Sequence, residues 1–133
     1  MDLQLTTTSA RQLEDVTERM ASLVAGLSNG VVLFNAPHTT VALFVSEFDE
    51  GLRDDFLKIA DGLLQNLRPF AHFRNNNPNT EAHVMSAMLG TSVMLPVEGG
   101  QLKLGTYQRI LFFELDGPKT RTIFATHVPS RAD

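Results

Sequence analysis

Apolar and polar residues follow different periods along the chain, and each period predicts a type of element. Leu3 and Leu5 alternate with polar neighbours, which is typical of a short opening strand. Two later segments, 31–35 and 41–45, are nearly continuous apolar runs of strand length. Because such strands are apolar on both faces, they require cover on both faces, from helices or from another subunit.

Helical spacing of apolar residues marks three further segments. Ser9 and Gln12 form a capping-box pattern, which predicts a helix that runs to Gly26. A second helix is expected over about residues 49–67, and a third over residues 79–89. The apolar residues expected to face the core are Leu13, Val16, Met20, Val24 and Leu27, then Leu52, Phe56, Ile59 and Leu63, and finally Val84, Met85, Met88 and Leu89.

The last third of the chain predicts strands joined by glycine-containing turns. Glu98-Gly99-Gly100 and Asp116-Gly117-Pro118 are the turns, so we expect two hairpins. The order of elements indicates a single α+β domain over residues 1–133, with a mostly antiparallel sheet and helices packed on it. The four strands are Val93–Val97, Gln101–Leu104, Tyr107–Leu115 and Lys119–Val128.

Composition narrows the classes of function. The 133 residues are 43% apolar and 20% charged, which suits one globular domain. A net charge of −4 and no dense Lys/Arg block argue against a nucleic-acid surface. The chain shows no secretion signal and no apolar run near the ~20 residues that span a bilayer, so we expect a cytoplasmic protein without a membrane partner. Without cysteine, any metal must be held by His, Asp, Glu or backbone oxygen.

Three histidines lie where apolar segments meet polar clusters. His38 separates the two apolar strand runs, His72 lies in the polar loop 70–79, and His83 is near the start of the third helix. Imidazole titrates near neutral pH and is the commonest metal ligand, so these positions suggest a shared site. The alternative is three unrelated histidines that make local hydrogen bonds.

Between Ala36 and Ala125 a series of short motifs occurs in a fixed order. The series is His38-Thr39-Thr40, Glu47, Asn79-x-x-x-His83, Met88-Leu89-Gly90-Thr91-Ser92, Leu95-Pro96-Val97, Leu104-Gly105-Thr106-Tyr107-Gln108 and Glu114-x-Asp116-Gly117-Pro118. Each motif is weak alone, but together they are specific. On these motifs the chain resembles the YjbQ-like family, also called secondary thiamine-phosphate synthases. The segment 46–50, Tyr107 and Arg109 depart from the family pattern.

The resemblance implies a homotrimer with a metal pocket near the subunit boundary. In it, His38, His72 and His83 would bind a divalent ion, with zinc favoured because three imidazoles leave a fourth position open for water or substrate. The activity implied is a weak joining of the thiamine pyrimidine diphosphate to thiazole phosphate. A metal-free alternative is that one histidine donates to a phosphate and another acts as general base.

Further residues receive roles around this pocket. Glu47 is expected to act as a catalytic base or to orient a ligating imidazole, the alternative being an ion pair with a nearby cation. Glu114 lies within an apolar strand and therefore needs a partner, for which Arg121 across the hairpin is the candidate. The residues expected to bind a phosphorylated ligand are Thr39, Thr40, Asn79, Gly105, Thr106 and Gln108. The cationic candidates are Arg74, Arg109, Lys119 and Arg121.

Three functions are therefore open. The first is a trimeric metalloenzyme that acts on a phosphorylated metabolite. The second is a binding protein that holds the metal or metabolite without turnover. The third is a structural trimer in which the histidine cluster stabilises an interface.

Overall fold

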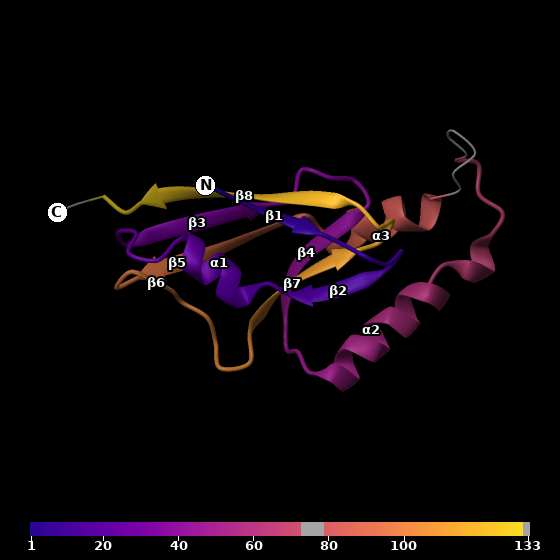
Figure 1. The fold of residues 1–133 in the computed structure, drawn as a ribbon, viewed down its shortest axis with the longest axis horizontal. Helices are drawn as coiled ribbons and strands as arrows, with labels where there is room; N and C mark the ends of the chain where they lie inside the picture. The colour runs from indigo at the N-terminus through magenta and orange to yellow at the C-terminus, as the bar shows by residue number, and fades with distance from the viewer. Residues whose placement is uncertain (73–78, 132–133) are drawn as a thin grey trace.

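The computed structural model describes residues 1–72 and 79–131, which form two antiparallel sheets and three α-helices (Figure 1). The larger sheet has the order β1-β8-β3-β5-β6, and the smaller has the order β2-β7-β4. The strands are β1 (Asp2–Thr6), β2 (Gln12–Asp15), β3 (Gly30–Asn35), β4 (Val41–Ser46), β5 (Ser92–Glu98), β6 (Gln101–Leu102), β7 (Arg109–Glu114) and β8 (Thr120–Pro129). The helices are α1 (Thr17–Leu23), α2 (Glu50–Gly62), α3 (Thr80–Leu89) and the 3-10 turn η1 (Gln65–Leu67).

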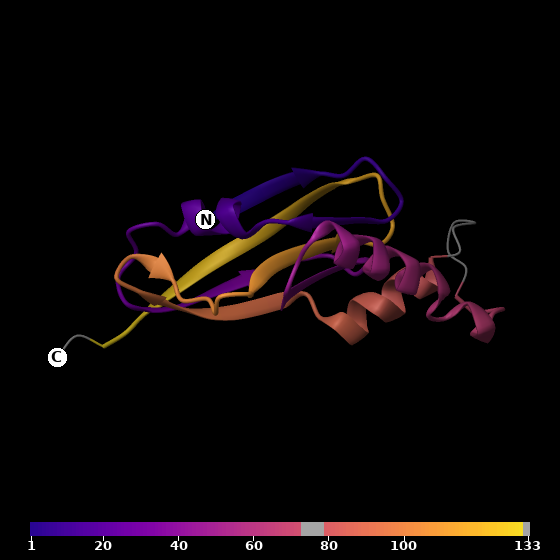
Figure 2. The same cartoon turned by 90° about the horizontal axis from the view of Figure 1, so that it is seen from below.

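Strand β7 lies at the centre of the molecule and separates two apolar clusters. Its residues Ile110 and Phe112 join the cluster between the two sheets and α1. Leu111 and Phe113 point the other way, into the cluster beneath α2 and α3. Figures 1 and 2 show these two helices together at one end of the molecule. The structure confirms the predicted α+β class, and no helix in its described part is long and apolar enough to cross a membrane.

The predicted start of the first helix is wrong. Gln12 begins strand β2, and α1 begins only at Thr17. The Gln12 side chain accepts the backbone N–H groups of Thr8 and Ser9, so it closes a turn rather than capping a helix. Four of the expected apolar positions are nevertheless buried: Leu13 of β2 in the cluster beneath α2 and α3, and Val16, Met20 and Val24 in the cluster between the sheets and α1, against which Leu27 packs partly buried. Apolar spacing alone does not separate these two possibilities.

The third helix forms over the predicted residues, whereas the second ends at Gly62 and is followed by the separate 3-10 turn η1; the buried faces of both helices differ from the prediction. On α2, Ile59 is 59% exposed, whereas Leu57 and Ala60 face the sheet. On α3, Met88 is 62% exposed, and the buried residues are Ala82, Met85 and Ser86. The contact face of each helix is therefore rotated by about one residue, or roughly 100°. The expected burial of Leu63 and Val84 is also wrong, because both side chains are exposed.

The first predicted hairpin forms between β5 and β6, but the second does not. Strand β7 pairs with β2 and β4, whereas β8 pairs with β1 and β3. The turn at residues 116–118 thus carries the chain from one sheet to the other. Glycine is required there, because a Cβ atom on Gly117 would lie 2.3 Å from the Ser9 carbonyl oxygen and 2.7 Å from the Glu114 Cγ atom.

Candidate functional site

A polar cavity of about 370 Å³ lies where the β3–β4 connection, the start of α3 and the β7–β8 turn meet. Strands β4 and β7 run antiparallel with Val41 opposite Glu114, so the start of one meets the end of the other. We call this cavity the histidine pocket. Its lining residues are Pro37, His38, Thr39, Thr40, Asn79, His83, Asp116, Lys119 and Arg121. The pocket therefore collects five of the residues singled out as metal or phosphate ligands, His38, Thr39, Thr40, Asn79 and His83.

His38 and His83, which both line this pocket, use their ring nitrogens in opposite ways. The Nε2 atom of His38 accepts the backbone N–H of Thr122 at 3.0 Å, so the ring proton is on Nδ1. The Nδ1 atom of His83 lies 3.1 Å from the Thr39 carbonyl oxygen and must donate, which leaves a lone pair on Nε2. One imidazole therefore offers a proton donor and the other a proton acceptor.

The neutral form of His38 is favoured by its surroundings. Burial lowers the pKa of His38, and the Arg121 guanidinium lowers it further. A neutral ring keeps the Nε2 lone pair that accepts the Thr122 N–H. The lowered pKa of His38 therefore agrees with a neutral ring that carries its proton on Nδ1.

His72 approaches the site from outside the pocket wall. Its ring packs edge-on against His83, with 5.0 Å between ring centroids. The Asn79 side-chain amide donates from Nδ2 to Asp116 at 3.0 Å, so its Oδ1 atom must accept from His72 Nε2 at 3.1 Å. The free nitrogen of a neutral His72 is then Nδ1.

The three imidazoles do not fit a shared metal ion in this arrangement. A histidine ligates through a lone pair, and the lone pair of His38 is used by the backbone of β8. His72 and His83 each retain one lone pair that could bind a metal. Within residues 1–72 and 79–131, no group of three His, Asp or Glu side chains is placed to hold a metal.

Arg121 is the most firmly held cation of the pocket. Its guanidinium donates to both carboxylate oxygens of Glu114, at 2.8 and 2.6 Å, and to the Thr40 hydroxyl at 2.9 Å. The predicted Glu114–Arg121 pair is confirmed, although it joins two sheets rather than two strands of a hairpin. Burial alone would raise the pKa of Glu114, but hydrogen bonds from Arg121 and Thr7 outweigh it and lower that pKa.

Lys119 is held at the pocket in a similar way. Its ammonium donates to Asp116 Oδ2 at 3.0 Å, the same oxygen that accepts from Asn79. Burial would raise the pKa of Asp116, but Asn79 and Lys119 lower it, so the carboxylate stays ionised. The sequence identified Asp116 only as part of a turn; its place in the motif Glu114-x-Asp116-Gly117-Pro118 was the signal for a site role.

The other predicted site residues lie at the opposite end of the small sheet. Glu47 is exposed just after β4, about 20 Å of strand away from Thr40. Gly105, Thr106 and Gln108 are exposed in the connection before β7, where the Gln108 side chain accepts the Gly105 N–H. Within one chain the structure does not bring this group together with the histidines.

Two of the cationic candidates are also placed elsewhere. Arg109 donates to Asp15 at 2.8 Å and to Glu18, so it ties β7 to the start of α1. Arg74 lies outside the described residues. Lys119 and Arg121 are therefore the candidates that reach the histidine pocket.

Comparison with known proteins agrees with the motif resemblance. The family model described as UPF0047 protein YjbQ-like matches residues 1–130. A UPF0047 protein of Archaeoglobus fulgidus is 41% identical over 123 residues, which cover 92% of this chain and 96% of that protein. The UPF0047 protein YugU of Bacillus subtilis is 35% identical over 127 residues, covering 92% and 93%.

Solved structures show the same fold. A YbjQ-like protein from Sulfolobus solfataricus P2 superposes with a TM-score of 0.86 at 31% identity, covering 94% of this chain and 92% of that one. A YjbQ/UPF0047 family protein from Clostridium acetobutylicum gives 0.85 at 30% identity, covering 96% and 99%. The chain belongs to the YjbQ-like UPF0047 family.

Proposed function

We propose that the histidine pocket binds a small phosphorylated metabolite and transfers a proton to and from it. The observation that carries this proposal is that His38 accepts and His83 donates in their hydrogen bonds to the backbone, at one cavity that Lys119 and Arg121 also line. His38 offers the Nδ1 proton to an oxygen of the ligand, and His83 offers the Nε2 lone pair as a general base. This is the metal-free alternative suggested by the sequence.

The cations suit a phosphate because they are oriented before it arrives. Within the described residues, Arg121 donates hydrogen bonds through Nε and Nη2, and Nη1 has no partner. Every fully buried polar side-chain atom in the described part of the chain has a hydrogen-bond partner, so Nη1 is not fully buried. Nη1 therefore keeps access to the pocket that Arg121 lines. Glu114 and Asp116 fix Arg121 and Lys119 in place, so a bound phosphate loses little affinity to ordering of these side chains.

Phosphate binding and proton transfer are tested separately. Inorganic phosphate, titrated by calorimetry, is expected to bind the wild type and to bind Lys119→Met about tenfold or more weakly, because a charge-assisted hydrogen bond is lost. Turnover is assayed with the thiamine pyrimidine diphosphate and thiazole phosphate, the pair implied by the family resemblance. His83→Gln should lose turnover but keep phosphate. His127→Gln is the matched control, since the His127 side chain hydrogen-bonds to the Ser28 carbonyl and does not line the histidine pocket.

The outcomes distinguish an enzyme from a binding protein. Phosphate binding with no turnover in the wild type would favour the non-catalytic function. Failure of the wild type to bind phosphate would refute the proposal as a whole.

A second candidate function is the binding of a divalent ion, zinc above all, by His72 and His83. The observation that favours it is that these two rings lie 5.0 Å apart and each retains a lone pair, on Nδ1 and Nε2 respectively. Metal analysis of the purified protein is expected to show zinc that is lost in His72→Ala and His83→Ala but kept in His38→Gln. A three-histidine site would instead lose zinc in all three variants.

We also infer that the chain associates with copies of itself through the outer face of the large sheet. Across β5, β3 and β8, three cross-strand rows on this face contain no charged residue, and the third row continues into Asp2 of β1 beside Phe124. The rows are Pro96–Val31–Val128, Met94–Leu33–Thr126 and Ser92–Asn35–Phe124. Met94 is 63% exposed, and Phe124 and Val128 are about half exposed, so this face supplies the uncovered strand surface that the sequence predicted for another subunit.

The number of copies expected is three, as the family resemblance implies. Light scattering after gel filtration should give a trimer for the wild type and a smaller species for Phe124→Lys, which places a positive charge on the apolar face. Tyr107→Lys, an exposed aromatic outside this face, is the control. An unchanged mass for Phe124→Lys would contradict the assignment of this surface.

A further inference from the structure

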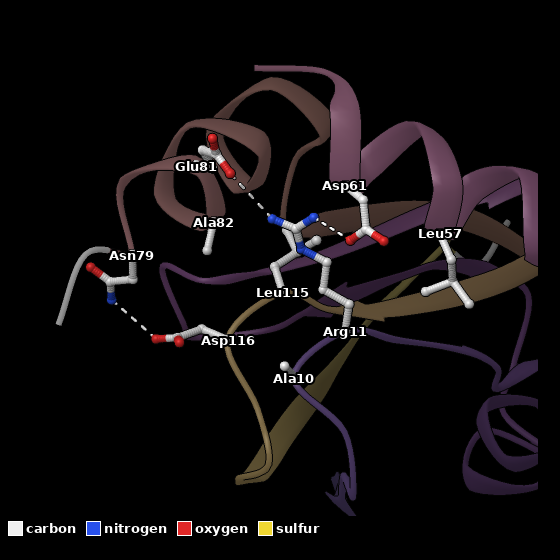
Figure 3. A pocket seen from close by; sticks show the side chains of 9 residues that line it. All are labelled: Ala10, Arg11, Leu57, Asp61, Asn79, Glu81, Ala82, Leu115 and Asp116. Atoms are coloured by element: carbon white, nitrogen blue, oxygen red, sulfur yellow. Dashed lines mark hydrogen bonds and ion pairs between the residues drawn. The ribbon is translucent and has the colours of Figure 1, made fainter. Parts of the chain in front are cut away.

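A second and larger cavity, of about 530 Å³, lies next to the histidine pocket and has no role in the function proposed above (Figure 3). It is bounded by Arg11 from the β1–β2 connection, by α2 and α3, and by the β7–β8 turn. We call it the arginine cavity. It shares the Asn79–Asp116 hydrogen bond with the histidine pocket as a common wall. Its volume is in the range of small-molecule sites.

Arg11 is a cation with unused donors at one side of this cavity. Its Nη1 donates to Asp61 at 2.6 Å, but its contact with Glu81 is long, at 3.5 Å. Glu81 is already engaged by Arg68 through two bonds, at 2.6 and 2.8 Å. Since the Asp61 side chain is 72% exposed, its pair with Arg11 is weak. A ligand carboxylate could therefore take the place of Asp61 at small cost.

Asp116 offers an acceptor on the wall that the arginine cavity shares with the histidine pocket. Both of its described hydrogen bonds, from Asn79 and from Lys119, end on Oδ2. Among residues 1–72 and 79–131, no donor contacts Oδ1. In Figure 3, Asp116 and Arg11 both line the cavity, with the Asp116 carboxylate turned toward Asn79 and the Arg11 guanidinium turned toward Asp61 and Glu81. A carboxylate and a guanidinium thus line the same cavity, each with bonding capacity left over.

Part of the cavity surface is apolar. Leu57 comes from α2, Ala82 from α3 and Leu115 from the end of β7, and all three belong to the cluster beneath the helices. Apolar atoms of a ligand placed here would be removed from water. The arrangement favours a ligand with two opposite charges and a short apolar group.

We propose that the arginine cavity binds a small zwitterion, an α-amino acid with an apolar side chain. Its carboxylate meets Arg11, its ammonium meets Asp116, and its side chain lies on Leu57, Ala82 and Leu115. This site goes beyond the proposed function and does not depend on it. Either charge alone would leave one wall unpaired, which is how such a site rejects a simple acid or a simple amine.

The test is calorimetric titration of the wild-type protein with L-alanine, L-valine and L-leucine. The two matched probes are 4-methylpentanoate, which is leucine without its amino group, and 3-methylbutylamine, which is leucine without its carboxylate. At least one amino acid should bind, and leucine should bind about tenfold or more tightly than either probe, because each probe lacks one charge-assisted hydrogen bond.

Two variants place the binding in this cavity. Arg11→Gln should weaken amino-acid binding about tenfold or more, and Ala10→Leu should abolish it by filling the space with a side chain at an exposed position. Arg19→Gln, at an exposed arginine on α1, is the control and should bind as the wild type does. All variants should still bind inorganic phosphate, so failure here is separable from failure of the histidine pocket.

Three results would overturn the proposal. The first is no binding of any of the three amino acids at millimolar concentration. The second is equal binding of leucine and of either matched probe. The third is unchanged leucine affinity in both Arg11→Gln and Ala10→Leu.

Discussion

The buried pair of Glu114 and Arg121 allows a sharp prediction about stability. We expect Glu114→Gln to lower the free energy of unfolding by about 3–5 kcal/mol, the usual cost of leaving one member of a buried ion pair uncompensated. Glu114 is fully buried and the Arg121 side chain is only 6% exposed, so water cannot replace the lost charge. The change conserves volume, so a cavity makes no contribution.

The geometry explains why glutamine cannot substitute well. Oε1 accepts from Arg121 Nε and lies 2.8 Å from the Thr7 hydroxyl, while Oε2 accepts from Arg121 Nη2 and from the Asp116 backbone N–H. Both oxygens therefore face donors. Whichever way the glutamine amide is turned, its NH2 group points at another N–H, and a buried group is left unsatisfied.

Urea unfolding followed by circular dichroism, at fixed protein concentration, measures the effect. Asp61→Asn is the control, because it removes a carboxylate from an exposed pair and should cost no more than about 1 kcal/mol. The double replacement Glu114→Leu/Arg121→Met should recover most of the loss, since it removes both charges and not one. The account of the pair would be refuted if Glu114→Gln lowered the free energy of unfolding by less than about 1 kcal/mol while the dependence of that free energy on urea concentration stayed unchanged.

Three further changes have defined outcomes. Gly117→Ala should cost about 1–3 kcal/mol in urea unfolding, because its Cβ would lie 2.3 Å from the Ser9 carbonyl oxygen; a neutral effect would mean that the turn shifts freely. Asp49→Ala should cost about 1 kcal/mol by the same measurement, since it removes the side-chain cap of α2. For acid unfolding, hydrogen bonding to Arg68 lowers the pKa of Glu81 below its ordinary 4.5, so its contribution to stability is present above pH 4.5 and is lost as pH falls through the lower folded value. Glu81→Gln should therefore reduce the pH dependence of stability below pH 4.5. If the loss of stability below pH 4.5 were the same in Glu81→Gln as in the wild type, the Arg68–Glu81 pair would not contribute to it.

Most of the fold follows from local patterns in the sequence. The long apolar strands and the α3 boundaries at Asn79 and Gly90 are signalled by runs, caps and glycines that act over a few residues. The failures concern choices that depend on partners far away in the chain. Gln12 joins β2 because β7 is available to pair with it. The turn at residues 116–118 looks like a hairpin, but each of its strands finds other partners.

The candidate site was predictable to a similar extent. The motif His38-Thr39-Thr40 and the pair Asn79 and His83 meet because α3 packs on β4, an arrangement consistent with the family resemblance. The choice of which nitrogen each imidazole presents depends on the backbone of β8 and on the Thr39 carbonyl, which no spacing rule encodes. Within one chain Glu47 lies far from the histidine pocket, because the six residues of β4 separate it from Thr40. Proximity in sequence is a poor guide along an extended strand.

The passage from β7 to β8 places both cations of the histidine pocket and both carboxylates that hold them within the segment Glu114–Arg121. A relative could therefore acquire a different ligand preference by changes confined to this short stretch, while the helices and the rest of both sheets stay as they are. The same concentration makes the segment vulnerable, since a single insertion there would change the spacing between a cation of the pocket and the carboxylate that holds it.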